Sequence, residues 1–167
     1  MKKNFILASL VAVLGIFSSF NALSYDGTIK FRGTILENGC TINGGKDQEV
    51  NFGKIPKERF KNAKGTIAAS QSFKIDLTNC PGSAIGIEFS GNKDTNDTTL
   101  YNSGVHGIGI LLAKDSGAKI DANTSVNGYS ITSKNVSIPL IAKLQSTNTT
   151  VGDGIIKSDV NFTLIYP

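Results

Sequence analysis

Apolar and polar residues alternate in several short stretches of this chain, and the clearest of these stretches is the last. Apolar side chains occupy every second position from Val160 onward, at Val160, Phe162, Leu164 and Tyr166. Because the side chains of a β-strand point alternately to its two faces, this period of two predicts a strand with one buried face. Such a strand either pairs with an earlier segment or leaves an edge of its sheet open.

A second alternation lies at residues 25–36. One face carries Ile29, Phe31, Gly33 and Ile35, and the other face is polar or charged. The simplest interpretation is the first strand of the domain, which would share in its own core. That interpretation does not account for Gly33, because a glycine inside a strand weakens the strand and usually marks the close approach of another backbone.

The rest of the chain repeats this pattern over short intervals. Strands are predicted at residues 50–55, 70–80, 85–89, 107–113 and 135–144, and residues 119–129 allow one more. Turns rich in Gly, Asn, Asp and Pro separate these strands, and only a single helical turn is expected, within residues 57–65. About seven or eight short strands at roughly ten-residue intervals indicate an all-β fold, either an immunoglobulin-like sandwich or a small barrel.

The first 24 residues are predicted to be a secretory signal peptide. Two lysines follow the initial Met, residues 5–20 carry no charge, and Ala22-Leu23-Ser24 offers small residues for cleavage after Ser24. A membrane anchor is the alternative, but the apolar run is short for a bilayer and is broken by glycine and serine. No membrane span is therefore expected in the mature chain, residues 25–167, which has the size of one domain.

Charge points to no nucleic-acid partner. The formal net charge of the whole chain is +4, and it falls by two once Lys2 and Lys3 are removed. The densest basic stretch, residues 54–64, contains Glu58 and is typical of a solvated loop.

Cys40 and Cys80 are the two cysteines of the chain. An exported protein meets an oxidising compartment, so a single disulfide is predicted, and closing this loop would stabilise the fold by roughly 4 kcal/mol. Two free thiols or a metal-binding pair remain the alternatives. The chain has one histidine, His106, and no nearby third and fourth ligand, so no metal and no cofactor are expected.

Candidate catalytic residues are not found in the sequence. His106 is expected in a loop or on the surface, the acidic residues do not cluster, and neither a Gly-x-Ser-x-Gly motif nor a phosphate-binding loop occurs. We therefore expect a protein that is not an enzyme.

Both ends of the mature chain resemble the subunits of chaperone–usher pili. Gly154, fourteenth from the end, and the penultimate Tyr166 match the C-terminal signature of that family. Residues 31–36, which read Phe-Arg-Gly-Thr-Ile-Leu and end four residues before Cys40, resemble its donor strand. Residues 50–55, 73–80, 107–110 and 139–142 are similar to family landmarks in the family's order. One departure is Ser158 and Val160, where many relatives have alternating alanines.

The resemblance implies an incomplete immunoglobulin-like sandwich that lacks its last strand. Residues 25–36 would form a donor-strand extension and residues 37–167 the pilin domain. Ile29, Phe31, Gly33 and Ile35 would fill a groove on a neighbouring subunit, and Gly33 would sit where that groove has no room for a side chain. The groove residues implied are Gly154, Val160, Phe162, Leu164 and Tyr166.

The family's partners and location follow from the same resemblance. They are neighbouring pilus subunits, a periplasmic chaperone and an outer-membrane usher, on a route through the periplasm to a fimbria that supports cell adhesion. Two alternatives stay open: a fimbrial tip adhesin, and another exported carbohydrate-binding β-sandwich. The chain has no Trp and four Tyr, which is sparse for the aromatic platforms of sugar-binding modules. The sequence is compatible with a major shaft subunit and with a minor adaptor.

Overall fold

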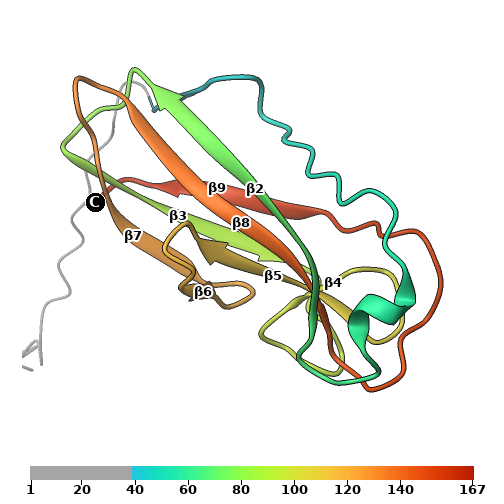
Figure 1. Cartoon of the computed structure of the whole chain (residues 1–167). Helices are drawn as coiled ribbons and strands as arrows, with labels where there is room; N and C mark the ends of the chain where they lie inside the picture. Colours follow the sequence, from blue (N-terminus) through green and yellow to red (C-terminus); the bar gives the residue numbers. More distant parts are fainter. Residues whose placement is uncertain (1–38) are drawn as a thin grey trace, which may run out of the picture. The chain divides into compact units, whose positions relative to one another are not determined.

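A computed structural model of the protein describes residues 39–167. Within these residues the chain forms two antiparallel β-sheets (Figure 1). The first sheet has the strand order β1-β2-β8-β5-β4, with β6 also paired to β5. Its strands are β1 (Thr41–Ile42), β2 (Ile67–Thr78), β8 (Val136–Ser146), β5 (Ile108–Lys114), β4 (Tyr101–Asn102) and β6 (Lys119–Ile120).

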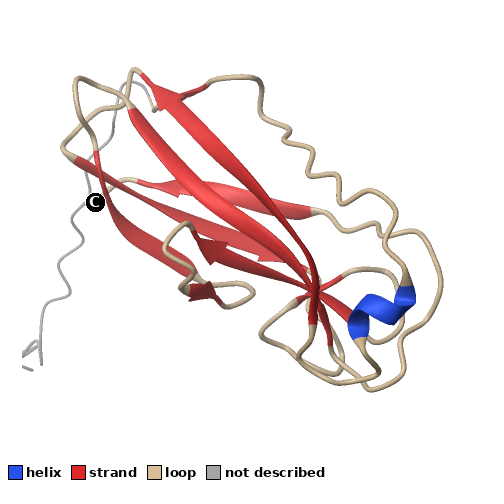
Figure 2. Ribbon diagram, in the orientation of Figure 1, coloured by secondary structure: helices blue, strands red, loops and turns tan. Residues whose placement is uncertain are grey.

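The second sheet has the order β7-β3-β9, formed by β7 (Ser125–Ser130), β3 (Ala84–Gly91) and β9 (Val160–Ile165). The one helical element of the described residues is the 3₁₀ turn η1 (Lys57–Phe60), drawn in blue in Figure 2. The prediction of an all-β chain with a helical turn in residues 57–65 is therefore confirmed. Residues 39–167 contain no helix long and apolar enough to cross a membrane.

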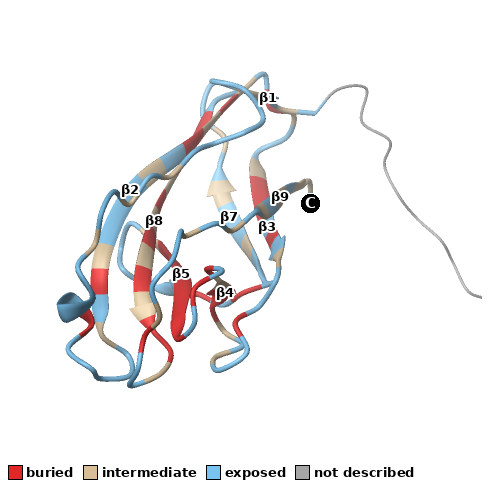
Figure 3. Cartoon of the chain, turned by 90° about the vertical axis from the view of Figure 1, so that its right-hand side faces the viewer, coloured by how far each residue is buried: buried red, intermediate tan, exposed pale blue. Residues whose placement is uncertain are grey.

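The core lies between the two sheets, and the alternation in the sequence explains its composition. In β8 the inward positions are all buried, namely Val136, Ile138, Leu140, Ala142 and Leu144, as predicted. In β3 the inward positions Ile85, Ile87 and Phe89 are buried as well. Figure 3 shows the two sheets facing each other, with buried segments along β8, β5 and β3.

The prediction of a strand at residues 50–55 was wrong. This segment pairs with no strand among the described residues, although Val50, Phe52 and Ile55 are half-buried against the core. The reason is local: the Asn51 side chain accepts a hydrogen bond from the Gly53 N–H at 2.8 Å, and Gly53 has a φ of +70°. This turn removes from the backbone a donor that a strand ladder would need.

The disulfide between Cys40 and Cys80 is confirmed, with a Cα–Cα distance of 4.1 Å. Cys40 immediately precedes β1 and Cys80 closely follows β2, and these two strands pair at Thr41–Thr78 and Ile42–Leu77. The covalent link therefore secures the beginning of the described chain to the first sheet.

Candidate functional site

The last strand, β9, is an edge strand in the part of the chain that the structure describes. It pairs with β3 from Gly86–Ile165 to Gly91–Val160, and its other side carries no strand. Val160, Phe162 and Leu164 face the core, as predicted, but each is only half-buried. A strand edge of this kind presents unpaired N–H and C=O groups to any segment that can lie beside it.

An apolar groove opens next to this edge. Its larger part has a volume of about 930 Å³ and is lined on one side by residues 46–50 and Phe52 and on the other by residues 156–162. Core side chains of the first sheet and of β3 form its floor, namely Phe73, Ile75, Ile110, Leu112, Ala142 and Phe89. The groove therefore brings side chains of the hydrophobic core and unpaired backbone to the same place.

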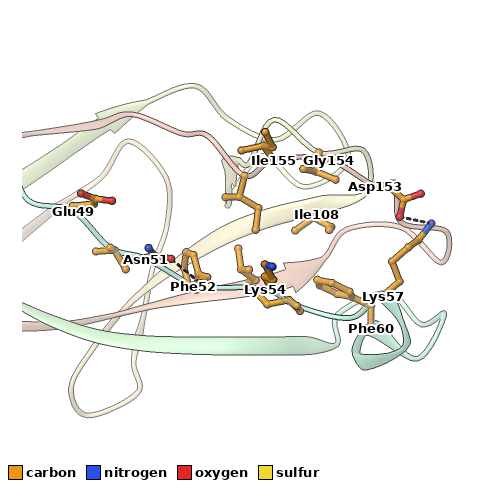
Figure 4. A pocket seen from close by; sticks show the side chains of 17 residues that line it. Glu49, Asn51, Phe52, Lys54, Lys57, Phe60, Ile108, Asp153, Gly154 and Ile155 are labelled. Carbon is orange, nitrogen blue, oxygen red and sulfur yellow. Dashed lines mark hydrogen bonds and ion pairs between the residues drawn. The ribbon is translucent and has the colours of Figure 1, made fainter.

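The smaller part of the groove has a volume of about 570 Å³ and extends toward η1. Phe60, Ile108 and Leu144 contribute apolar surface to it, and residues 49–55 and 152–156 form its two walls (Figure 4). Four residues line both parts, namely Glu49, Val50, Phe52 and Ile156. Their side chains mark the junction at which one cavity continues into the other.

An ion pair crosses the far end of the smaller cavity. The Nζ of Lys57 lies 3.2 Å from Oδ1 of Asp153, and Figure 4 shows the pair beyond Ile108 and Phe60, at the opposite end from Glu49. Ile155, on the rim beside it, is 88% exposed, which is unusual for a large apolar side chain.

Three of the five predicted groove residues line the cavities: Gly154 the smaller one, and Val160 and Phe162 the larger one. A Cβ atom on Gly154 would lie 3.3 Å from Cγ2 of Val105, so the wall is closely packed at this point. Leu164 lines neither cavity and instead packs into the core, paired with Ile87.

Tyr166 lies beyond the groove and has a different contact. Its hydroxyl oxygen accepts a hydrogen bond from the backbone N–H of Cys40 at 2.7 Å. A Cβ atom on Gly39 would lie only 2.7 Å from the same oxygen, so a side chain at position 39 would displace this contact. The penultimate residue thus ties the end of the chain to the disulfide.

The predicted donor residues Ile29, Phe31, Gly33 and Ile35 lie outside the described residues, as does the predicted signal peptide. The first wall, residues 46–55 and Lys57, was not predicted as part of the site, and neither were Asp153, Ile155 and Ile156. The alternation of Val50 and Phe52 predicts a strand, whereas in the structure these two residues form part of the groove wall.

Ionisable groups with shifted pKa values lie away from the groove. A hydrogen bond from Lys74 holds the pKa of Asp76 below its ordinary value, and the Thr99 hydroxyl does the same for Asp97. Burial raises the pKa of Tyr101 and Tyr129. His106 is exposed in the loop before β5, and residues 39–167 hold no cluster of three or more His, Cys, Asp or Glu suited to a metal. The apolar floor and the unpaired edge of β9 suit the groove to binding an apolar segment.

Comparison with known proteins identifies the kind of protein that carries this groove. The family model described as fimbrial protein matches residues 29–167. The chain belongs to the fimbrial protein family. Long polar fimbria protein A of Salmonella typhimurium is 31% identical, over 99% of this chain and 97% of the relative.

Solved structures agree with this assignment. A type I fimbria protein and antigen of Burkholderia pseudomallei is 27% identical, with a TM-score of 0.61 over 84% of this chain and 97% of the other. The P pilus rod subunit PapA, 18% identical, matches in fold with a TM-score of 0.64 over 78% of this chain and 100% of its own. The fimbrial fold is the immunoglobulin-like sandwich, and in residues 39–167 it is incomplete beside β9.

The family defines the broad role of the chain. Fimbrial proteins are structural and non-enzymatic, and this chain is a structural subunit of a fimbria. As a fimbrial subunit it acts, together with other subunits, in an extracellular surface appendage.

Proposed function

We propose that this fimbrial subunit polymerises by donor-strand exchange, in which residues 25–36 of one subunit fill the groove beside β9 of the next. The observation that carries the proposal is the combination of an apolar floor with an unpaired strand edge in one groove. Strand addition at such an edge gains ladder hydrogen bonds from the backbone, while alternate side chains enter pockets.

The pattern of the proposed donor strand matches the shape of the groove. All strand pairs of the described residues are antiparallel. A donor antiparallel to β9 would place Ile35 in the smaller cavity, and Phe31 and Ile29 in the larger one. Gly33 would then lie at the junction, beside the side chains that line both cavities. The reverse direction would put bulky Phe31 at that junction, which disfavours it.

Burial of the donor side chains supplies the driving force. Ile29, Phe31 and Ile35 would each contribute roughly 1.5–3 kcal/mol when they leave water. Because the donor segment and the groove are different surfaces, the contact is heterologous and does not close on itself, so repetition builds a fibre.

Before assembly the same groove needs protection. An exposed apolar edge strand is a template for aggregation, and a periplasmic chaperone would cover it until an outer-membrane usher delivers the subunit to the cell surface. The mature subunit expressed without a chaperone is therefore expected to aggregate or to be degraded.

Two kinds of damage test the assignment. Deletion of residues 25–36 removes the donor, so the product should bind a chaperone and accept a donor peptide but should not extend a fibre. Phe162→Asp places a charge in the groove wall, so chaperone capture should fail first. Thr163→Lys is the control, because Thr163 is the exposed neighbour on the same strand and a lysine there would face Glu88 on β3. Gly33→Leu should resemble a mild deletion of the donor.

Chaperone pull-down and SDS-resistant polymer ladders read out both steps. The assignment is wrong if the deletion polymerises normally, or if it loses chaperone binding as severely as Phe162→Asp. A tip adhesin needs a groove but donates no strand, so immunogold labelling of the wild-type subunit at fimbrial tips alone would favour that alternative.

A further inference from the structure

The end of the groove near η1 is closed by a contact between its two walls. Lys57 belongs to the first wall and Asp153 to the second, and their ion pair spans the space between them. The side chains are 47% and 83% exposed. A pair so open to water is held weakly, so either member can change partner at little cost.

The sequence of the proposed donor strand places an acid at this end. With Ile35 in the smaller cavity, alternation directs residue 37 to the same face of the strand, about 7 Å further along. Residue 37 is Glu37, which lies outside the described residues. The apolar lining of the cavity, Phe60 and Ile108, gives way to Lys57 in that direction (Figure 4). The incoming carboxylate would therefore meet the Lys57 ammonium group.

We propose that Lys57 is a specificity-determining residue, which exchanges Asp153 for Glu37 of the neighbouring subunit when the donated strand is seated. The inference rests on the proposed donor–acceptor function, and the partner that supplies Glu37 is a second copy of this chain. One ion pair replaces another, so the exchange adds little affinity. A basic donor residue could pair only with Asp153, and it would then leave the ammonium groups of Lys54 and Lys57 without that carboxylate on the first wall, which disfavours basic donors relative to acidic ones.

A charge swap in the full-length chain tests the inference. Glu37→Lys and Lys57→Glu should each slow the growth of SDS-resistant polymer by about two- to fivefold at low salt, as expected for an exposed pair. The double variant carries the swapped pair at every junction and should recover the wild-type rate. In about 1 M salt, where the screening length is about 3 Å, all four proteins should polymerise alike.

Two further variants make the test specific. Lys54 lines the same cavity on the same wall but forms no ion pair among residues 39–167, so Glu37→Lys with Lys54→Glu should not recover the rate. Asp153→Asn releases Lys57 for the neighbour and should speed polymerisation by a similar factor. The amount of soluble, disulfide-bonded subunit, measured on non-reducing gels, should be equal in all variants.

The inference is overturned if the single charge changes leave the rate unaltered, if the swap does not restore it, or if Asp153→Asn slows assembly. If Lys54→Glu also restored the polymerisation rate of Glu37→Lys, Lys57 would have no specific role. Failure of the underlying function looks different, because polymer would then form even after deletion of residues 25–36.

Discussion

Strands β8 and β9 carry the same sequence pattern, yet the structure buries them to different depths. β8 lies between β2 and β5, and each of its inward side chains from Val136 to Leu144 is at most 9% exposed. β9 lies beside β3 alone, and its core-facing side chains Val160, Phe162 and Leu164 stay half-buried. Alternation thus indicates which face of a strand is apolar, while the number of neighbouring strands determines how deeply that face is buried.

The difference assigns separate roles to the two regions. β8 has its strand partners within the subunit, so the contribution to stability of a side chain such as Leu140, which lines neither cavity, should not depend on anything outside it. β9 retains apolar surface and backbone groups that no strand among residues 39–167 covers. The two regions are compared by unfolding a subunit that lacks residues 25–36, released from its chaperone at a dilution that prevents aggregation, alone and with a peptide of that sequence.

Loss of the disulfide should have the largest effect on the free energy of unfolding, and the effect should be equal with and without the peptide. Replacing Cys40 and Cys80 by Ser opens a link that spans 40 positions in sequence, which should lower the free energy of unfolding by roughly 4 kcal/mol. Denaturant titration at equilibrium measures this loss. Neither cysteine lines the groove. A loss of stability that differs with and without the peptide would therefore contradict the separate roles of the core and the groove.

Truncation of matched core residues should distinguish the two strands. Leu140→Ala in β8 should cost roughly 3 kcal/mol with or without peptide, because Leu140 is fully buried in either state. Phe162→Ala in β9 should cost less in the empty subunit and clearly more in the complex, where the donor would complete its burial. Equal costs of Phe162→Ala in both titrations would argue against a donated strand at β9.

Removal of one hydroxyl group should have the smallest effect. Tyr166→Phe deprives the partly buried Cys40 N–H of its acceptor and should cost about 1 kcal/mol. Tyr129→Phe is the matched control, because the buried Tyr129 hydroxyl has no hydrogen-bond partner among residues 39–167. Removal of the Tyr129 hydroxyl should be neutral or slightly stabilising. The thermal unfolding midpoint of Tyr166→Phe should therefore be lower than that of Tyr129→Phe.

Much of the fold could be predicted from the sequence because its period-two signals are strong. The predicted strands at residues 70–80, 85–89, 107–113 and 135–144 correspond to β2, β3, β5 and β8. The failure at residues 50–55 has a local cause, the turn between Asn51 and Gly53, which an alternating pattern does not reveal.

The groove was only partly predictable, because it is a property of the tertiary structure. Its floor collects side chains from β2, β3, β5 and β8, and each of these looks like an ordinary core residue in its own strand. The ion pair between Lys57 and Asp153 joins segments far apart in the chain, and neither residue stands out in the sequence. Val160 and Phe162 were identified because alternation and the family signature coincide there.

Residue-level hydrogen exchange of the β9 backbone amides tests the central claim most directly. In the subunit lacking residues 25–36, the amides of residues 160–165 that point away from β3 should exchange quickly, while those of β8 are protected on both sides. Addition of the donor peptide should protect the outward β9 amides and leave the β8 amides unchanged. Outward amides that are already protected in the empty subunit, or that stay unprotected with peptide bound, would contradict the account.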